Sequence, residues 1–181
     1  MRLFAMSGSL SSGSANTALL RAAVADAVNW EVRVFEQLAE VPLVGASGAD
    51  DLPVVAALRR EVAAADAVLL VTPEYGHSLP GVLKNALDWL VASGDLAGKP
   101  VAAVSAAPTP TGGIRAQLAL VTTLLAQSAE VVAQLSVPGV RAVLDEDGEV
   151  TDAAVRRRLG EALHALAESV ERNAHRSARR G

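Results

Sequence analysis

Residues 7–17 form the first of three loops whose residue types could bind a ligand. They are Ser-Gly-Ser-Leu-Ser-Ser-Gly-Ser-Ala-Asn-Thr. Glycines and hydroxyls at the start of a helix suit a phosphate group, because backbone N–H groups and the helix dipole can both face its oxygens. The hydroxyls of Ser9, Ser14 and Thr17 and the amide of Asn16 would add donors. An ordinary strand-to-helix turn capped by serine and asparagine is the structural alternative.

This loop differs from the two familiar phosphate-binding motifs. It lacks the Gly-Lys-Ser/Thr ending of nucleoside-triphosphatase loops. Gly8 and Gly13 also do not have the spacing of the dinucleotide-binding fingerprint. The loop therefore predicts a phosphate site of another kind or a simple helix cap.

The second loop, residues 72–78, holds the single tyrosine of a chain that is poor in aromatic residues. It follows an apolar run at 67–71 and precedes an amphipathic helix that ends near Trp89. The third loop, residues 106–113, is rich in proline and threonine and ends in two glycines, which would let the backbone approach a ligand closely. Each loop could bind a flat cofactor or could simply start a helix.

Hydrolase and metal chemistry are both disfavoured. Gly76-His77-Ser78 resembles a nucleophile motif, but Pro80 stands where a nucleophile elbow needs glycine. The acidic pair at 50–51 and the acidic triplet at 145–147 have no histidine at ligand spacing, and the chain has no cysteine. We expect no metal site, no disulfide and no catalytic thiol.

The elements that must position these loops alternate along the chain. Apolar runs predict strands at 2–6, 30–35, 67–71, 100–106 and 130–137. Helical periodicity predicts helices at 16–28, 54–65, 81–91, 113–127 and 152–170. This alternation predicts one α/β domain with a doubly wound, five-stranded parallel sheet that is covered by helices on both faces. In such a sheet ligands bind outside the carboxyl ends of the strands, where the three loops would lie.

Composition narrows the class of protein further. The 181 residues suffice for one well-buried domain, no apolar run is long enough to cross a membrane, and the start of the chain lacks a signal-peptide pattern. We therefore expect a cytoplasmic protein that binds neither membrane nor nucleic acid. The formal net charge is −4, but arginines gather after Glu171. Residues 172–181 are predicted to be a basic, disordered tail.

The three loops together resemble the NADPH-dependent FMN reductase family, which includes quinone, chromate and azo-dye reductases. The resemblance rests on Gly8-Ser9-Leu10 with Ser14 and Asn16, on Pro73-Glu74-Tyr75, on the specific block Ser-Leu-Pro-Gly-Val-Leu-Lys-Asn-Ala-Leu-Asp-Trp at 78–89, and on Gly112-Gly113 with Arg115 and Gln117. These blocks cover nearly the whole domain in the family's order. The resemblance implies a flavodoxin-like sheet of order 2-1-3-4-5 in residues 1–171.

The resemblance also implies an FMN site and an activity. The phosphate would contact Ser9, Leu10, Ser14, Asn16 and Thr17. The isoalloxazine ring would lie between the two later loops, at Pro73, Glu74, Tyr75, Gly76, Ser78, Ala106, Ala107, Thr109 and Gly112. Hydride from NADPH or NADH would pass to the flavin and on to a quinone, chromate, azo dye or free flavin, with no catalytic side chain required. The family forms dimers and tetramers, so we expect a homodimer or homotetramer with Trp89 at its interface.

Two departures from the family pattern bear on cofactor binding. Many members carry an arginine between the positions of Leu10 and Ser14, where this chain has Ser11 and Ser12. Gly76 replaces the usual asparagine. The missing arginine predicts weaker retention of FMN, and two alternatives to a reductase stay open. One is a flavodoxin-type electron carrier, and the other is an FMN-binding domain that has lost activity.

Overall fold

The first and third strands pair directly at the middle of a five-stranded sheet. In the computed structural model, which describes residues 1–11, 13–46 and 52–178, the strands are β1 (Arg2–Ser7), β2 (Glu31–Val34), β3 (Ala67–Thr72), β4 (Pro100–Ala106) and β5 (Glu130–Val137). Their order is β2-β1-β3-β4-β5 and every pairing is parallel. The predicted sheet order is confirmed. β3 and β4 are buried along their whole length, as expected for central strands with helices on both faces.

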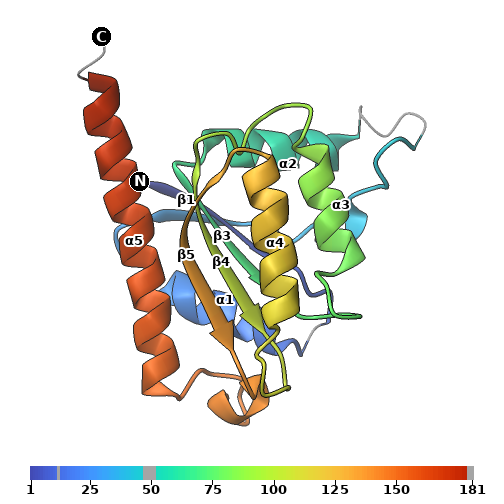
Figure 1. Ribbon diagram of the computed structural model, residues 1–181, viewed down its shortest axis with the longest axis vertical. Helices are drawn as coiled ribbons and strands as arrows, with labels where there is room; N and C mark the ends of the chain where they lie inside the picture. Colours follow the sequence, from blue (N-terminus) through green and yellow to red (C-terminus); the bar gives the residue numbers. More distant parts are fainter. Residues whose placement is uncertain (12, 47–51, 179–181) are drawn as a thin grey trace.

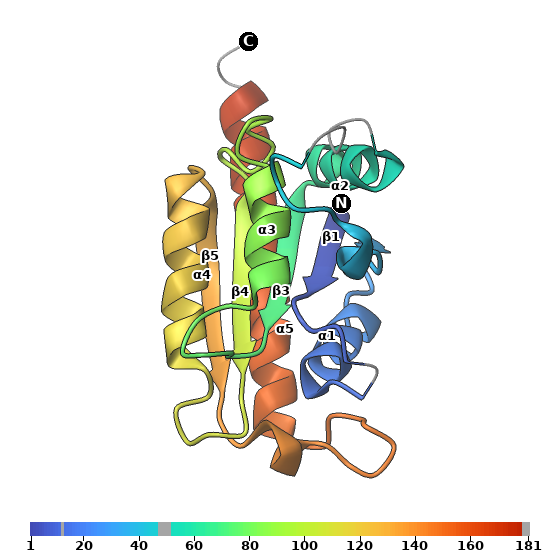
Figure 2. The ribbon, with the colours of Figure 1, turned by 90° about the vertical axis from the view of Figure 1, so that its right-hand side faces the viewer.

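Five α-helices cover the sheet (Figure 1). They are α1 (Ala15–Ala25), α2 (Pro53–Ala64), α3 (Gly81–Trp89), α4 (Ile114–Ala126) and α5 (Ala153–Ala178). Side chains of α1 and α5 pack in one hydrophobic cluster, and those of α2, α3 and α4 pack in another on the opposite face. Figure 2 shows the resulting layers. Two short 3₁₀ helices, η1 (Leu38–Glu40) and η3 (Val140–Val143), were not predicted.

Helix α5 corrects the predicted disordered tail. It continues to Ala178, so residues 172–178 form its last turns, while residues 179–181 lie outside the described part. Glu168 Oε2 and Arg172 Nη1 lie 3.8 Å apart as an i,i+4 ion pair. His175 and Arg176 lie in the last turn, where positive charge complements the helix dipole. The basic residues therefore end a helix. No helix in the described ranges has the length and apolar character to cross a membrane.

Trp89 does not provide the expected interface. Its side chain is 3% exposed, and its indole N–H donates to the carbonyl of Pro42 at 2.7 Å. The guanidinium of Arg59 lies over the ring, 5.3 Å from its centre. Trp89 therefore belongs to the core of the protein and would not be available to a second subunit.

Candidate functional site

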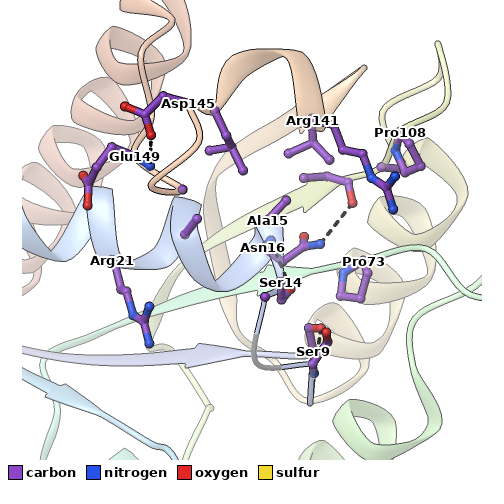
Figure 3. Close-up of a pocket in the computed structure, with 18 of the residues that line it drawn as sticks. Ser9, Ser14, Ala15, Asn16, Arg21, Pro73, Pro108, Arg141, Asp145 and Glu149 are labelled. Carbon is purple, nitrogen blue, oxygen red and sulfur yellow. Dashed lines mark hydrogen bonds between the residues drawn. The ribbon is translucent and has the colours of Figure 1, made fainter.

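A cavity of about 740 Å³ lies at the carboxyl ends of the strands. It is lined by the β1–α1, β3–α3 and β4–α4 loops, by α1, and by the segment between β5 and α5 (Figure 3). Its volume falls within the range of about 300–1,000 Å³ that is usual for ligand pockets. The sheet topology thus brings the three predicted loops together at one place.

The β1–α1 loop is held together by its own hydroxyls. Ser14 is the N-cap of α1, and its Oγ accepts from the N–H groups of Asn16 and Thr17 at 3.2 and 3.4 Å. The hydroxyls of Ser7 and Thr17 are hydrogen-bonded at 3.1 Å, and Ser7 Oγ also accepts from the N–H of Ser9. Glycine fits closely at position 8, because a Cβ there would meet Leu83 Cδ2 at 2.8 Å and the leucine side chain would have to shift. Part of the predicted phosphate-binding set therefore shapes the loop.

Asn16 joins this loop to the end of β4. Its Nδ2 donates to the carbonyl of Ala106 at 3.3 Å, drawn as a dashed line in Figure 3. The residue is only 5% exposed, and its Oδ1 has no hydrogen-bond partner among the described residues. This oxygen is itself buried within the cavity wall, where an unpaired acceptor costs free energy.

The β3–α3 loop makes a tight hairpin beside the cavity. The backbones of Tyr75 and Ser78 exchange hydrogen bonds of 2.9 and 3.0 Å across Gly76 and His77. Both central residues have positive φ, 55° and 63°, which matches a type I′ turn. Glycine at position 76 suits this conformation. The turn leaves the side chain of Tyr75 exposed at the rim.

Glu74 has a structural role that the sequence did not reveal. Its side chain is 8% exposed, and Oε2 accepts from the backbone N–H groups of Arg115 and Ala116 at 3.0 and 3.3 Å. Burial acts to raise the pKa of Glu74, but the hydrogen bonds from Ala116, His77 and Arg115 outweigh it and hold that pKa below its ordinary value. The carboxylate therefore satisfies the first turn of α4 and ties two of the site loops together.

His77 contacts both partners of this junction through one ring nitrogen. Nδ1 lies 3.4 Å from Glu74 Oε1 and 3.1 Å from Arg115 Nη1. Arginine can only donate, so an unprotonated Nδ1 accepts from Arg115, whereas a protonated Nδ1 donates to Glu74. The two hydrogen bonds are therefore alternatives. Neither gives His77 the position of a base beside Ser78.

The β4–α4 loop is fixed against the end of β5. Gly112 has φ +60°, and its carbonyl accepts from Ser105 Oγ at 3.0 Å. A Cβ at this glycine would lie 2.7 Å from the backbone nitrogen of Pro138. Only glycine fits here without a shift of the backbone. The close approach that this glycine allows is between the β4–α4 loop and Pro138.

The predicted site residues fall into three groups. The cavity is lined by Ser9, Ser14, Asn16, Pro73, Glu74, Tyr75, Ala106 and Ala107. Leu10 and Thr17 instead line a second cavity of about 440 Å³ on the other side of the β1–α1 loop. Gly76, Ser78, Thr109 and Gly112 line neither cavity. Gly76, Ser78 and Gly112 instead set the course of the loops.

Sequence reasoning missed several charged residues of the cavity wall. Arg21 comes from α1, Arg141 from η3, and four carboxyl groups come from residues 145–149. Asp145 Oδ1 accepts from the N–H groups of Asp147 and Glu149, which closes this hairpin. Arg21 could have been found, because it stands four residues after Thr17 and so shares a helix face with it. The hairpin gave no signal beyond that of a turn.

Comparison with known proteins agrees with this architecture. The model of a family described as NADPH-dependent FMN reductase matches residues 1–141. A quinone reductase of Escherichia coli K12 is 34% identical over 181 residues, covering 95% of this chain and 96% of that protein. An NAD(P)H-dependent FMN reductase of Pseudomonas aeruginosa is 32% identical over 174 residues, covering 92% and 93%.

A solved structure shows the same fold over nearly the whole chain. The flavoenzyme NAD(P)H:(acceptor) oxidoreductase FerB of Paracoccus denitrificans superposes with a TM-score of 0.79 at 29% identity, covering 94% of this chain and 97% of that one. The family match spans the strands β1 to β5 and the three loops of the cavity. The chain therefore belongs to the NADPH-dependent FMN reductase family.

Proposed function

We propose that this protein is an FMN-dependent NAD(P)H oxidoreductase that binds FMN in the cavity at the carboxyl edge of the sheet and reduces a quinone. The observation that carries the proposal is the meeting of the α1 N-terminus with the β3–α3 and β4–α4 loops at one cavity of about 740 Å³. A helix N-terminus attracts a phosphate group. The residues present thus fit FMN.

The phosphate end of the proposed site lies at the β1–α1 loop. Ser9, Ser14 and Asn16 line the cavity there, and the dipole of α1 favours an anion at its first turn. The Oγ of Ser14 already accepts two backbone hydrogen bonds, but its O–H remains able to donate.

The ring end of the proposed site lies between the β3–α3 and β4–α4 loops. Pro73, Glu74 and Tyr75 line one side, while Ala106 and Ala107 offer little side-chain bulk on the other. A flat ring could therefore approach the backbone closely. Glu74 would act indirectly, by holding both loops through the first turn of α4.

Bound FMN would supply the chemistry, namely acceptance of hydride from a reduced nicotinamide and delivery of electrons to an acceptor. The chain's own task is to bind and orient the reactants. Tyr75 at the rim offers an aromatic face to an incoming ring. No side chain needs to act as an acid or base in this scheme.

The names of several similar proteins give a quinone as the electron acceptor. Besides the E. coli quinone reductase, a Burkholderia protein described as 2-hydroxy-1,4-benzoquinone reductase is 40% identical over 90 residues, which is 49% of this chain. A Bacillus NADPH azoreductase is 45% identical over 78 residues. Azo dyes, chromate and free flavin are therefore comparison substrates in the test.

The test is anaerobic reconstitution with FMN followed by titration with NADH or NADPH. We expect loss of the flavin absorbance band with at least one nicotinamide, and its return on addition of benzoquinone. Bound FMN that neither nicotinamide bleaches would replace the proposal with an electron carrier or an inactive domain. A protein that does not take up FMN at all would refute the site itself.

We also propose that the protein forms a homodimer through α4. Ile114, Leu118 and Leu125 on this helix are exposed and recur at helical spacing, with Val121 between them. Figures 1 and 2 show α3 beside α4 on the same face, and Val91 just after α3 is exposed as well. A stripe of exposed apolar side chains on one helix is typical of a subunit interface.

A further inference from the structure

We propose that Arg21 binds the phosphate group of FMN and supplies the positive charge that the β1–α1 loop lacks. The inference rests on the proposed FMN site, and it adds a residue that the family pattern of the loop does not contain. It also changes the expectation of weak FMN retention, which assumed that no arginine was near the phosphate.

Arg21 is well placed for this role on α1. Ser14 caps the helix, and Thr17 and Arg21 follow at the spacing that puts side chains on one face. Long side chains in a helix lean toward its N-terminus, which here is the end that faces the loop. Ser9, Ser11 and Arg21 are common to both cavities that flank the loop. The guanidinium therefore stands beside the loop and within the wall of the cavity.

The charge around the cavity would make such a cation favourable for binding a phosphate. No basic residue occurs between Arg2 and Arg21, so the loop itself has none. Asp145, Glu146, Asp147 and Glu149 all line the same cavity and would repel a dianion. The other arginine of the wall, Arg141, lies beside Pro108, away from Arg21 in Figure 3. Arg21 is thus the arginine of the wall that belongs to the helix whose N-terminus starts at the loop.

The side chain of Arg21 is also available. It is exposed, and it makes no ion pair or hydrogen bond with another residue in the described ranges. Arg156, in contrast, is paired with Asp26 at 2.9 Å. An unpaired guanidinium can bind phosphate through two parallel hydrogen bonds. Ser9, Ser14 and Asn16 of the loop line the same cavity as Arg21.

The decisive measurement compares FMN with riboflavin, which has the same ring but no phosphate. We expect Arg21→Ala to raise the Kd for FMN about 10- to 100-fold in a fluorescence titration, as for loss of a charged hydrogen bond, and to leave riboflavin binding unchanged. Arg21→Lys should restore part of the affinity. Arg60→Ala, which removes an exposed arginine from α2, is the matched control and should change neither Kd.

Each other outcome would overturn the inference. Equal losses for FMN and riboflavin would assign Arg21 to packing, and thermal melts of each variant would show whether the fold is intact. Unchanged FMN binding with a weaker preference of the enzyme for NADPH over NADH would assign Arg21 to the nicotinamide nucleotide.

Wild-type protein that binds riboflavin as tightly as FMN would refute this inference alone. Wild-type protein that binds neither flavin would refute the proposed function as well.

Discussion

At the scale of single residues, Glu74 shows how a side chain in a ligand-binding motif can act on the protein itself. The family resemblance placed it at the flavin ring. Its carboxylate instead accepts two N–H groups of the first turn of α4, and it also contacts His77. Such hydrogen bonds satisfy donors that a helix cannot satisfy internally. The cavity wall thus depends on hydrogen bonds that the protein makes with itself.

This role predicts a pH-dependent contribution to stability. The pKa of Glu74 is lowered in the folded protein from an ordinary value of 4.5, so its stabilising effect is complete above that pH and is lost as the pH falls below it. We expect Glu74→Gln to destabilise the protein by about 1–2 kcal/mol at pH 7 in urea denaturation, because a charged acceptor is replaced by a neutral one.

The difference between Glu74→Gln and the wild type should shrink as the pH is lowered toward 3. Glu171→Gln, which removes an exposed carboxylate on α5, should show no comparable loss at any pH. A constant difference across this range would mean that the ionised form of Glu74 has no special role.

At the scale of elements, the loops at the carboxyl edge support one another as well as the cavity. The β4–α4 loop meets the end of β5 at Gly112, whose neighbours include the backbone of Val137 and Pro138. Asn16 ties the start of α1 to the end of β4. The path of each of these loops therefore depends on contacts with strands that are distant in sequence.

Gly112→Ala tests this contact between elements. The substitution adds a clash with backbone at 2.7 Å to the strain of positive φ, so we expect a loss greater than the roughly 1–2 kcal/mol that a left-handed conformation costs alone. Gly94→Ala is the control, because Gly94 has φ +68° but open space around it. Equal losses in urea denaturation would show that the loop can move away from β5 at no cost.

At the scale of the whole molecule, the sheet separates two helical faces with different surfaces. α4 exposes an apolar stripe, whereas α5 is amphipathic and ends in basic turns. Figure 1 shows α5 on the other side of the sheet from α4. The dimer proposed above would bury the apolar face.

The proposed dimer predicts that Leu118→Glu gives a monomer. Leu118 is 60% exposed at the middle of the stripe, and a buried, unpaired carboxylate there would oppose association. Light scattering after size-exclusion chromatography at micromolar concentration measures the mass directly. Val28→Glu, at a residue that is 85% exposed and follows α1, should leave the mass of the wild type unchanged. A wild-type protein that elutes as a monomer would refute the dimer.

The sequence by itself determined the order and type of the main elements and the loops that carry the site. Continuous apolar runs such as 67–71 and 100–106 identify buried parallel strands, and their connections are fixed by the need to cover both faces of the sheet. Gly8, Glu74 and Gly112 were visible as members of sequence blocks that resemble a family, although the contacts that they make could not be read from the sequence.

Only the tertiary structure decided what those residues do. Glu74 accepts hydrogen bonds from the N–H groups of Arg115 and Ala116. Asn16 donates its side-chain N–H to the carbonyl of Ala106. Arg21 and the acidic hairpin join the same cavity from opposite ends of the chain. Contacts between segments so far apart leave no periodicity or spacing in a single sequence, since they depend on how the sheet brings its carboxyl edge together.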